Sequence, residues 1–270
     1  MDKSSENKNK LISICGMKID MVQIPEVVQI MEDWIIQKRS GNYIVVSNAY
    51  DVMMSKNNPE VKKAVNNSSL SVPDGISLVL LARIYDYYLR KRVYGPDLML
   101  EFLKIANCKG YSNFFYGSTK EVLDLLIKNL KIKFPSLNII RAYSPPFRKL
   151  TPDEDREIVD MINKASPDVL WVSLGCPKQQ LWMYAHKDKL NVPVMVGVGA
   201  AFDFLSRIKP QAPRWVRDTG FEWLFRLVTE PKRLWRRYLI NESQFLFYAG
   251  REVILNLFKN SKKPDVKIWK

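Results

Sequence analysis

Residues 69–83 read SLSVPDGISLVLLAR, and this stretch decides the fold class. Its first four residues form a short apolar run typical of a buried strand, and residues 75–83 have the composition of the first turns of a helix. Asp74 stands at the turn between them. Ligands of parallel α/β sheets bind where strands end and helices begin, so a carboxylate here is a candidate catalytic base. An alternative is that Asp74 only caps the helix, because Asp is among the most favourable N-cap residues.

The same strand-then-helix alternation continues along the chain. Further apolar runs typical of covered parallel strands stand at residues 43–47, 111–116, 137–142, 168–174 and 192–196. Residues 11–14 and 17–20 flank Cys15 and Gly16 and indicate a small hairpin. We therefore predict a mostly parallel, Rossmann-like α/β sheet with helices on both faces, a small N-terminal hairpin and a helical C-terminal appendage.

The predicted organisation has three parts. Residues 1–10 are polar and charged and are predicted to be a disordered arm, and residues 11–210 form the α/β core. Residues 211–270 are aromatic, basic and helical, and are predicted to be an appendage that associates with a membrane. No secretory pattern and no apolar run long enough to span a bilayer is visible in the sequence.

Composition excludes several classes of site. The chain has 270 residues, of which 47% are apolar, as expected of a globular protein with a substantial core. Its three cysteines are odd in number and far apart, which fits a reducing cytosol and argues against a disulfide framework or a cysteine metal cluster. The single histidine, His186, excludes multi-histidine metal sites. No Asp-x-Asp pair stands at a strand end, so we expect no bound metal and no cofactor.

The charge is unusual and unevenly spread. The net charge is +14, and residues 207–270 carry 15 lysines and arginines against 6 acidic residues. A basic patch of this kind attracts nucleic acid, anionic lipid or pyrophosphate. Nucleic-acid binding therefore stays open as an alternative, although no nucleic-acid-binding motif is visible. The tryptophans of this region favour the interface of an anionic membrane instead.

Candidate site residues gather at predicted strand ends. Asn48 follows the strand at 43–47, so Asn48 and Asp74 face one cleft if the two strands are parallel neighbours. Glycine turns that could cradle a diphosphate, or could simply make tight turns, include Gly117-Ser118, Gly175 and Gly199. Lys178 begins a helix and could hold phosphate. Asp203 is equally consistent with a nucleoside contact and with a structural role. No dinucleotide fingerprint or Gly-Lys-Ser/Thr phosphate loop is present, which disfavours the alternative of a dinucleotide-dependent oxidoreductase.

A series of motifs resembles the WecG/TagA/CpsF family of bacterial glycosyltransferases. The resemblance rests on VVSN at 45–48, VPDG at 72–75, RVYGPD at 92–97, GCPKQQ at 175–180, GVGAAFDF at 197–204 and EWLFRL at 222–227. It implies metal-independent, inverting transfer of a sugar from a UDP-sugar to a polyprenyl-diphosphate-linked acceptor, in cell-surface polysaccharide or teichoic acid synthesis. It further implies an enzyme in the cytoplasm, peripheral at the inner face of the membrane. Self-association is left open.

The resemblance also implies roles for particular residues. Asp74 becomes the base, Asn48 lies beside the substrate, and Gln180 occupies a catalytic position at which many relatives have Glu. Arg226, Arg233 and Arg236 come to lie near the donor diphosphate. Many members have Thr where this chain has Val46, so the hydroxyl of that Thr is absent or is supplied by Ser47. The donor sugar is therefore open among N-acetylmannosamine, its uronic acid and glucose.

Overall fold

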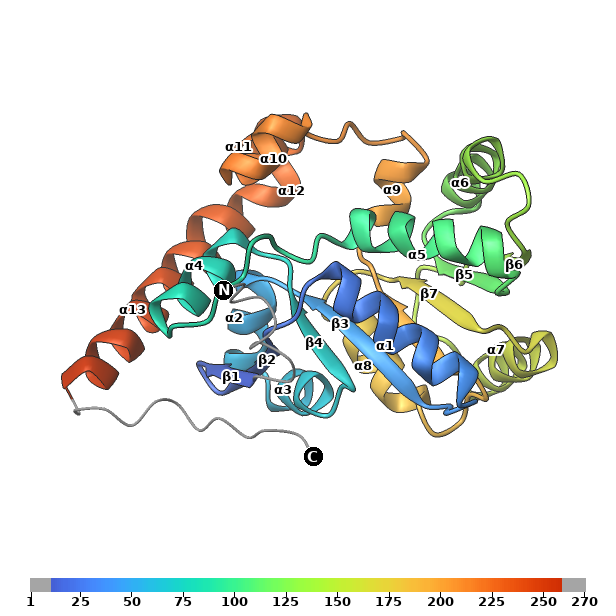
Figure 1. The fold of residues 1–270 in the computed structure, drawn as a ribbon, viewed down its shortest axis with the longest axis horizontal. Helices are drawn as coiled ribbons and strands as arrows, with labels where there is room; N and C mark the ends of the chain where they lie inside the picture. The colour runs from blue at the N-terminus through green and yellow to red at the C-terminus, as the bar shows by residue number, and fades with distance from the viewer. Residues whose placement is uncertain (1–10, 259–270) are drawn as a thin grey trace, which may run out of the picture.

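The computed structural model describes residues 11–258, which form an α/β fold around a six-stranded parallel sheet (Figure 1). The strands lie in the order β4 (Leu70–Pro73), β3 (Asn42–Ser47), β8 (Val194–Gly197), β7 (Val169–Ser173), β5 (Asn113–Gly117) and β6 (Ile139–Tyr143). β1 (Leu11–Ile14) and β2 (Met17–Asp20) pair antiparallel in a separate hairpin. The predicted fold class is confirmed. The predicted arm at residues 1–10 lies outside the described residues.

Helices cover both faces of the sheet. One face carries α1 (Ile24–Ile36), α5 (Gly95–Lys109), α6 (Lys120–Lys133) and α9 (Ala201–Leu205). The other carries α2 (Ala49–Asn57), α3 (Pro59–Asn66), α7 (Pro152–Ala165) and α8 (Lys178–His186). The helix α4 (Ile76–Ile84) follows the edge strand β4 and packs with the hairpin.

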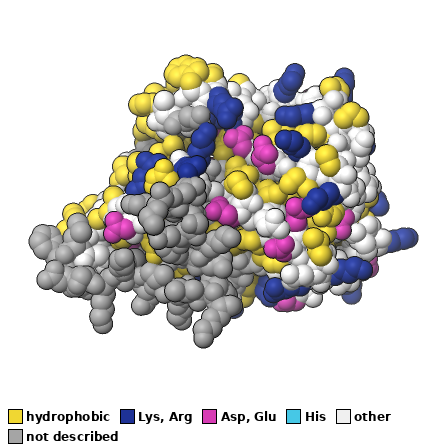
Figure 2. Space-filling model, viewed as in Figure 1, with side chains coloured by type: hydrophobic (Ala, Val, Ile, Leu, Met, Phe, Trp, Pro, Cys, Tyr) yellow, Lys and Arg dark blue, Asp and Glu magenta, His cyan; other side chains and the backbone are white. Residues whose placement is uncertain are grey.

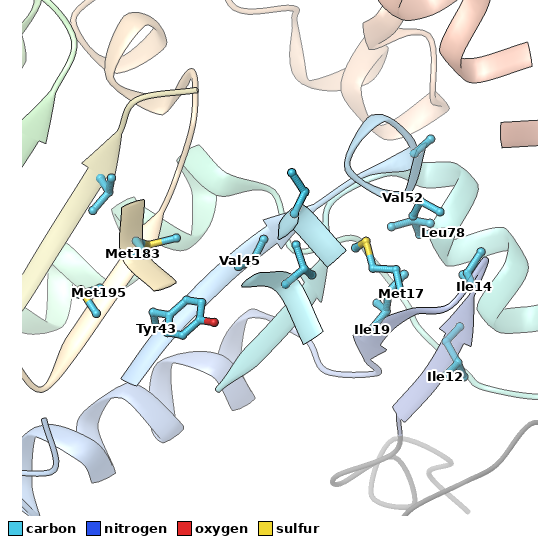
Figure 3. Close-up of a cluster of buried hydrophobic side chains, with 14 of the residues drawn as sticks. Ile12, Ile14, Met17, Ile19, Tyr43, Val45, Val52, Leu78, Met183 and Met195 are labelled. Carbon is cyan, nitrogen blue, oxygen red and sulfur yellow. The ribbon is translucent and has the colours of Figure 1, made fainter. Parts of the chain in front are cut away.

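The side chains of β3 show how the sheet divides the core. Tyr43 and Val45 point into the cluster shared with the hairpin, α2 and α8 (Figure 3), whereas Ile44 and Val46 point into the cluster under α1 and α5. All four are buried. Full burial of an aliphatic side chain contributes roughly 1.5–3 kcal/mol to the stability of the fold. A strand that is covered on both faces therefore has apolar side chains at successive positions, which makes a continuous apolar run in the sequence. This is why the sequence identified β3 as a central strand.

The turn after β4 separates the two interpretations of Asp74. The N-cap of α4 is Gly75, and no side chain caps this helix. Asp74 stands one residue earlier, and its backbone N–H donates to the Ser47 carbonyl at 2.7 Å. The interpretation of Asp74 as a mere helix cap is therefore wrong. By contrast, Asn48 does cap α2, because its Oδ1 accepts from the Tyr50 backbone N–H at 3.0 Å.

The C-terminal appendage is a run of helices with no described strand, as predicted. It consists of α10 (Arg214–Thr219), α11 (Glu222–Thr229), α12 (Pro231–Trp235), the π-helix η2 (Arg236–Asn241) and α13 (Glu242–Phe258). α13 returns to the core beside α2, where Phe245 and Ala249 are buried. Glu252 Oε2 accepts from the Cys15 backbone N–H at 2.8 Å, which ties α13 to the hairpin. The appendage is thus held on the core by α13, which follows Arg226, Arg233 and Arg237 in the chain.

Apolar side chains are exposed over this appendage. Figure 2 shows hydrophobic side chains gathered over the end of the molecule formed by α10–α12, with Lys and Arg beside them. Trp215, Val228 and Phe247 are among the most exposed, at 72%, 72% and 66%. Within residues 11–258, no helix is both long and apolar enough to cross a membrane.

Candidate active site

Two adjoining cavities open at the carboxyl ends of β3 and β4, beneath the appendage. Asn48, Asp74, Arg226 and Arg237 line both of them. The first, of about 180 Å³, extends to the loops at Gly175 and Gly199 and is called the glycine cavity. The second, of about 250 Å³, is called the α4 cavity; beyond the shared residues it is lined by Ile76, Leu80, Trp223, Tyr238 and Glu242. Asp74 therefore stands at the junction of two binding spaces.

The Asp74 carboxyl group is held in a state suited to accepting a proton. Its side chain is 20% exposed, and its buried Oδ1 accepts no hydrogen bond, while Arg92 Nη1 lies 3.7 Å away. Burial raises the pKa of Asp74 to about 7, with Glu222 adding to the rise and Arg92 opposing it. A base with a pKa near neutrality is efficient at physiological pH, because it is substantially ionised and still basic.

Arg92 and Glu222 support Asp74 and were given no role in the sequence analysis. Arg92 donates from Nη2 to Glu222, and its guanidinium lies 4.3 Å from the centroid of the Tyr94 ring. The carboxylates of Asp74 and Glu222 raise the pKa of Arg92, so this cation is permanent. Both residues stand in quoted motifs, RVYGPD at 92–97 and EWLFRL at 222–227, and this was the available signal. Glu222 reaches the site from α11, 130 residues after Arg92.

Two arginines of the appendage present unpaired donors to the cavities. Nε of Arg226 and Nε of Arg237 are buried and have no hydrogen-bond partner among the described residues. Arg237 Nη2 donates to Asn48 Oδ1 at 3.2 Å, and its guanidinium lies 4.7 Å from the Tyr50 ring centroid. A buried donor without a partner is costly, and a guanidinium pairs well with phosphate oxygens. The pair of arginines therefore suits an anionic ligand that lies between them and the strand ends.

Of two adjacent arginines at the start of the π-helix, the second faces the cavities. We predicted Arg236, but the structure has Arg237 lining both cavities and Arg236 exposed, 5.1 Å over the Trp235 ring. In η2 the hydrogen bonds run from residue i to i+5, so each turn holds more residues than an α-helix and the faces shift. Arg237 stands four residues after Arg233, a spacing that favours a shared face even in an α-helix, whereas Arg236 was taken from the family resemblance.

Arg233 and Asp203 lie at the margin of the glycine cavity. Arg233 lines it, as expected, and makes two 2.7 Å hydrogen bonds to Glu230. Asp203 lines neither cavity; its Oδ2 lies 2.8 Å from Lys209 Nζ. The structural interpretation of Asp203 fits this ion pair.

Gln180 and Ser47 lie behind the cavities. Gln180 is completely buried, and its Nε2 donates to Asp51 Oδ1 at 2.7 Å. Asp51 Oδ2 in turn accepts from the Asn48 backbone N–H at 3.0 Å, so Gln180 acts on the site through Asp51 and Asn48. The Ser47 hydroxyl pairs with Ser71 at 2.9 Å, whereas the Val46 side chain lines the glycine cavity. Ser47 therefore does not supply a hydroxyl at the Val46 position in this structure.

The remaining predicted site residues divide into two groups. Gly175 and Gly199 reach the glycine cavity with φ of 77° and 54°, and nothing lies within 4 Å of a Cβ added to either. Ser118 and Lys178 instead line a larger cavity of about 530 Å³ on the other side of the β7–α8 loop, with Tyr116, Leu174 and Trp182. Gly117 lies beside it at the end of β5, paired with Ser173. This space is called the β5–β7 cavity.

The acidic side chains that line the cavities do not form a described metal site. Within residues 11–258, no cluster of three or more His, Cys, Asp or Glu side chains is arranged to hold a metal ion. Positive charge in the cavities comes from guanidinium groups instead, and these have a fixed charge and planar geometry.

Comparison with known proteins gives a family and consistent relatives. The model described as "Glycosyl transferase WecG/TagA/CpsF family" matches residues 12–259. A protein of Bacillus spizizenii named N-acetylglucosaminyldiphosphoundecaprenol N-acetyl-beta-D-mannosaminyltransferase is 30% identical over 80% of this chain and 82% of its own length. Proteins with the same name from Bacillus subtilis and Staphylococcus aureus are each 28% identical, over 78% and 83% of this chain and 80% and 87% of their own.

Proposed function

The chain belongs to the WecG/TagA/CpsF family of glycosyltransferases and is a glycosyltransferase; on that premise we propose that it moves N-acetylmannosamine, or a related hexose, from a UDP-sugar to a polyprenyl-diphosphate-linked N-acetylglucosamine. The relatives named above carry this acceptor and this sugar in their names. The observation that carries the proposal is the Asp74 carboxyl group, which has a raised pKa and faces two arginines with unpaired buried N–H groups.

Asp74 acts as the general base. In its ionised form it accepts the proton of the acceptor hydroxyl while that oxygen attacks the anomeric carbon of the donor sugar. A positioned base of this kind contributes about 10²–10⁴ in rate. Because the bond to the UDP oxygen breaks as the new glycosidic bond forms on the opposite face, one displacement inverts the anomeric configuration. Arg92, 3.7 Å away, keeps the carboxylate in place and is too far for a strong hydrogen bond.

The leaving diphosphate is stabilised by the glycine cavity. Arg226 and Arg237 offer their unpaired Nε–H groups, and Arg233 adds a third cation at the margin. The Gly175 and Gly199 loops leave backbone open to an anion, because no side chain covers them. Fixed charges in a partly buried site stabilise developing charge without reorganisation, which is why we propose catalysis without a metal.

The nucleoside of the donor extends toward the β5–β7 cavity in this proposal. β3 and β5 are three strand spacings apart across β8 and β7, or roughly 14 Å, which is the scale of an extended nucleoside diphosphate. Ser118 and Lys178 then offer a hydroxyl and a cation beyond the diphosphate. Trp182, stacked on Tyr116 at 4.5 Å, has a buried Nε1–H without a partner that a base carbonyl could accept.

The appendage brings this site to the membrane that holds the acceptor. Its exposed side chains combine tryptophans, such as Trp215 and Trp223, with basic residues, the pattern of a helix that lies in an anionic interface. We further propose that the protein works at the inner face of the cell membrane. The same segment carries Arg226 and Arg237, so the part of the chain that docks on the membrane also supplies side chains that line both cavities.

The test is UDP release over a panel of UDP-sugars with N-acetylglucosaminyl-diphospho-polyprenol in vesicles. We expect release with UDP-N-acetylmannosamine or a close relative, dependent on the acceptor, and an inverted product by NMR. Asp74→Asn should keep UDP affinity by calorimetry and reduce turnover at least about a hundredfold. Near-normal turnover of this variant, or release that ignores the acceptor, contradicts the proposal.

A further inference from the structure

We propose that the α4 cavity is the acceptor subsite, that Glu242 holds a hydroxyl or amide of the acceptor sugar there, and that the polyprenyl chain leaves along the outer face of α4. This inference rests on the proposed function and divides the site into two halves. Asp74 lies in both cavities, so a base at this junction reaches a hydroxyl on one side and an anomeric carbon on the other.

The two cavities differ in the groups that each adds to the shared residues. Arg226 and Arg237 are common to both, and the glycine cavity adds Arg233, Asp51 and open glycine backbone. The α4 cavity adds Arg92, which is paired with Glu222, and the carboxyl group of Glu242. The donor diphosphate fits beside the open glycine backbone, and the acceptor's own diphosphate can pair with Arg226 and Arg237, which line both cavities. Sugar hydroxyl and amide N–H groups are donors, which carboxylates accept well.

Glu242 is the carboxylate available for this contact. Glu222 is already engaged by Arg92, whereas the Glu242 side chain makes no hydrogen bond or ion pair with the described residues. Burial raises the pKa of Glu242 and Arg237 opposes this rise. This half-buried carboxylate beside Tyr238 is therefore available to accept a hydrogen bond from a ligand in the α4 cavity.

An apolar stripe leads from the cavity to the surface. Ile76, Leu80 and Ile84 recur every four residues on α4 and therefore share one face of this helix. Ile76 and Leu80 line the α4 cavity, and Leu80 and Ile84 are 51% and 55% exposed. Because the stripe begins in the cavity and ends in solvent, its occupant is a chain attached to the ligand in that cavity. For the proposed acceptor, this chain is the isoprenoid.

The first experiment compares Glu242→Gln with Glu157→Gln, a control at an exposed position of α7 that lines none of the three cavities. Initial rates are measured at varied UDP-sugar and varied lipid acceptor, and UDP binding is measured by calorimetry. We expect Glu242→Gln to raise KM for the acceptor about tenfold or more, with KM for the donor and UDP affinity unchanged. An equal rise in both KM values, weakened UDP binding or an unchanged acceptor KM overturns the assignment.

The second experiment tests the path of the lipid, and does not depend on the folding of the Glu242 variant. Leu80→Asp is compared with Ile132→Asp, which alters a side chain 73% exposed on α6. Detergent-solubilised acceptors with two isoprene units and with eleven are used. We expect Leu80→Asp to raise KM for the long acceptor about tenfold and for the short one less than about twofold. Equal effects on both lengths, or none, contradict the path along α4. If the wild type transfers to neither acceptor while still binding UDP, the proposed function fails, and the subsites of a different acceptor are then in question.

Discussion

The pH dependence of catalysis depends most directly on the surroundings of Asp74. Its pKa of about 7 belongs to the unliganded protein, so the acid limb of kcat/KM should bend near pH 7. The base is active when ionised, and activity therefore rises with pH. With this pKa, roughly one tenth of the molecules are ionised at pH 6 and roughly nine tenths at pH 8, so kcat/KM should increase about tenfold between them.

Two variants should move this limb in opposite directions. The Glu222 carboxylate raises the pKa of Asp74 and the Arg92 cation lowers it. Glu222→Gln should shift the limb to lower pH, and Arg92→Gln should shift it to higher pH. Glu32→Gln serves as the control, because Glu32 is also a buried carboxylate paired with a cation, Lys109, on the α1 side of the sheet.

The assay is UDP release over pH 5 to 9 with donor and acceptor both below their KM, so that the rate reports the free enzyme, together with circular dichroism and thermal unfolding at each pH. Removal of one partner of a buried ion pair destabilises proteins by about 3–5 kcal/mol, so unfolding must be measured separately from rate. An acid limb of kcat/KM between pH 4 and 5 would refute the assignment of Asp74 as a base with a raised pKa. A limb that both variants move in the same direction would refute the opposing effects of Arg92 and Glu222 on that pKa.

Four further predictions concern other parts of the molecule. Activity should persist in excess EDTA, since guanidinium groups neutralise the diphosphate; full loss restored by Mg²⁺ or Mn²⁺ would show otherwise. Charge reversal at Arg233 and Arg236 should weaken binding to anionic liposomes most at low salt, and sedimentation indifferent to salt and to these changes would remove the electrostatic part of the docking. Gln180→Leu should lower kcat about tenfold with donor KM nearly constant, because Gln180 orients Asn48 only through Asp51, and loss of UDP binding would indicate direct contact. Burial raises the pKa of Asp20 to about 6, so on raising the pH the folded state keeps this proton to a higher pH than the unfolded chain does. The contribution of Asp20 to the free energy of unfolding should therefore fall by up to about 3 kcal/mol between pH 4 and 7. Urea unfolding of Asp20→Asn should show a smaller fall over the same pH range.

The sequence predicted what depends on local pattern and on the strand-end rule. β3 and β4 were recognisable as apolar runs, and they are adjacent and parallel, which brings Asn48 and Asp74 to one cleft. Gly175 and Gly199 follow β7 and β8 and meet the same cleft for the same reason.

Features that depend on distant packing were missed. Glu222 reaches Arg92 only because α11 folds over the turn, and no local signal encodes that approach. Arg236 was taken from the family resemblance, which did not distinguish it from the adjacent Arg237 that lines both cavities. Gln180 was assigned from a motif, and a motif does not distinguish a side chain in the cavity from one that supports it from behind.

The docking of α13 on the β1–β2 hairpin has a consequence for the order in which the molecule becomes competent. A chain is made from its N-terminus, so the hairpin, the sheet and Asp74 exist before the arginines at 226, 233 and 237 are synthesised. The contact between Glu252 and Cys15 closes a loop of 237 residues, and such distant pairings form late in folding. Under the proposed function, the nascent core therefore has its base before it has the arginines that bind the donor diphosphate. Donor binding then depends on a segment that is made after the rest of the site and lies between the core and the helix that docks on the hairpin.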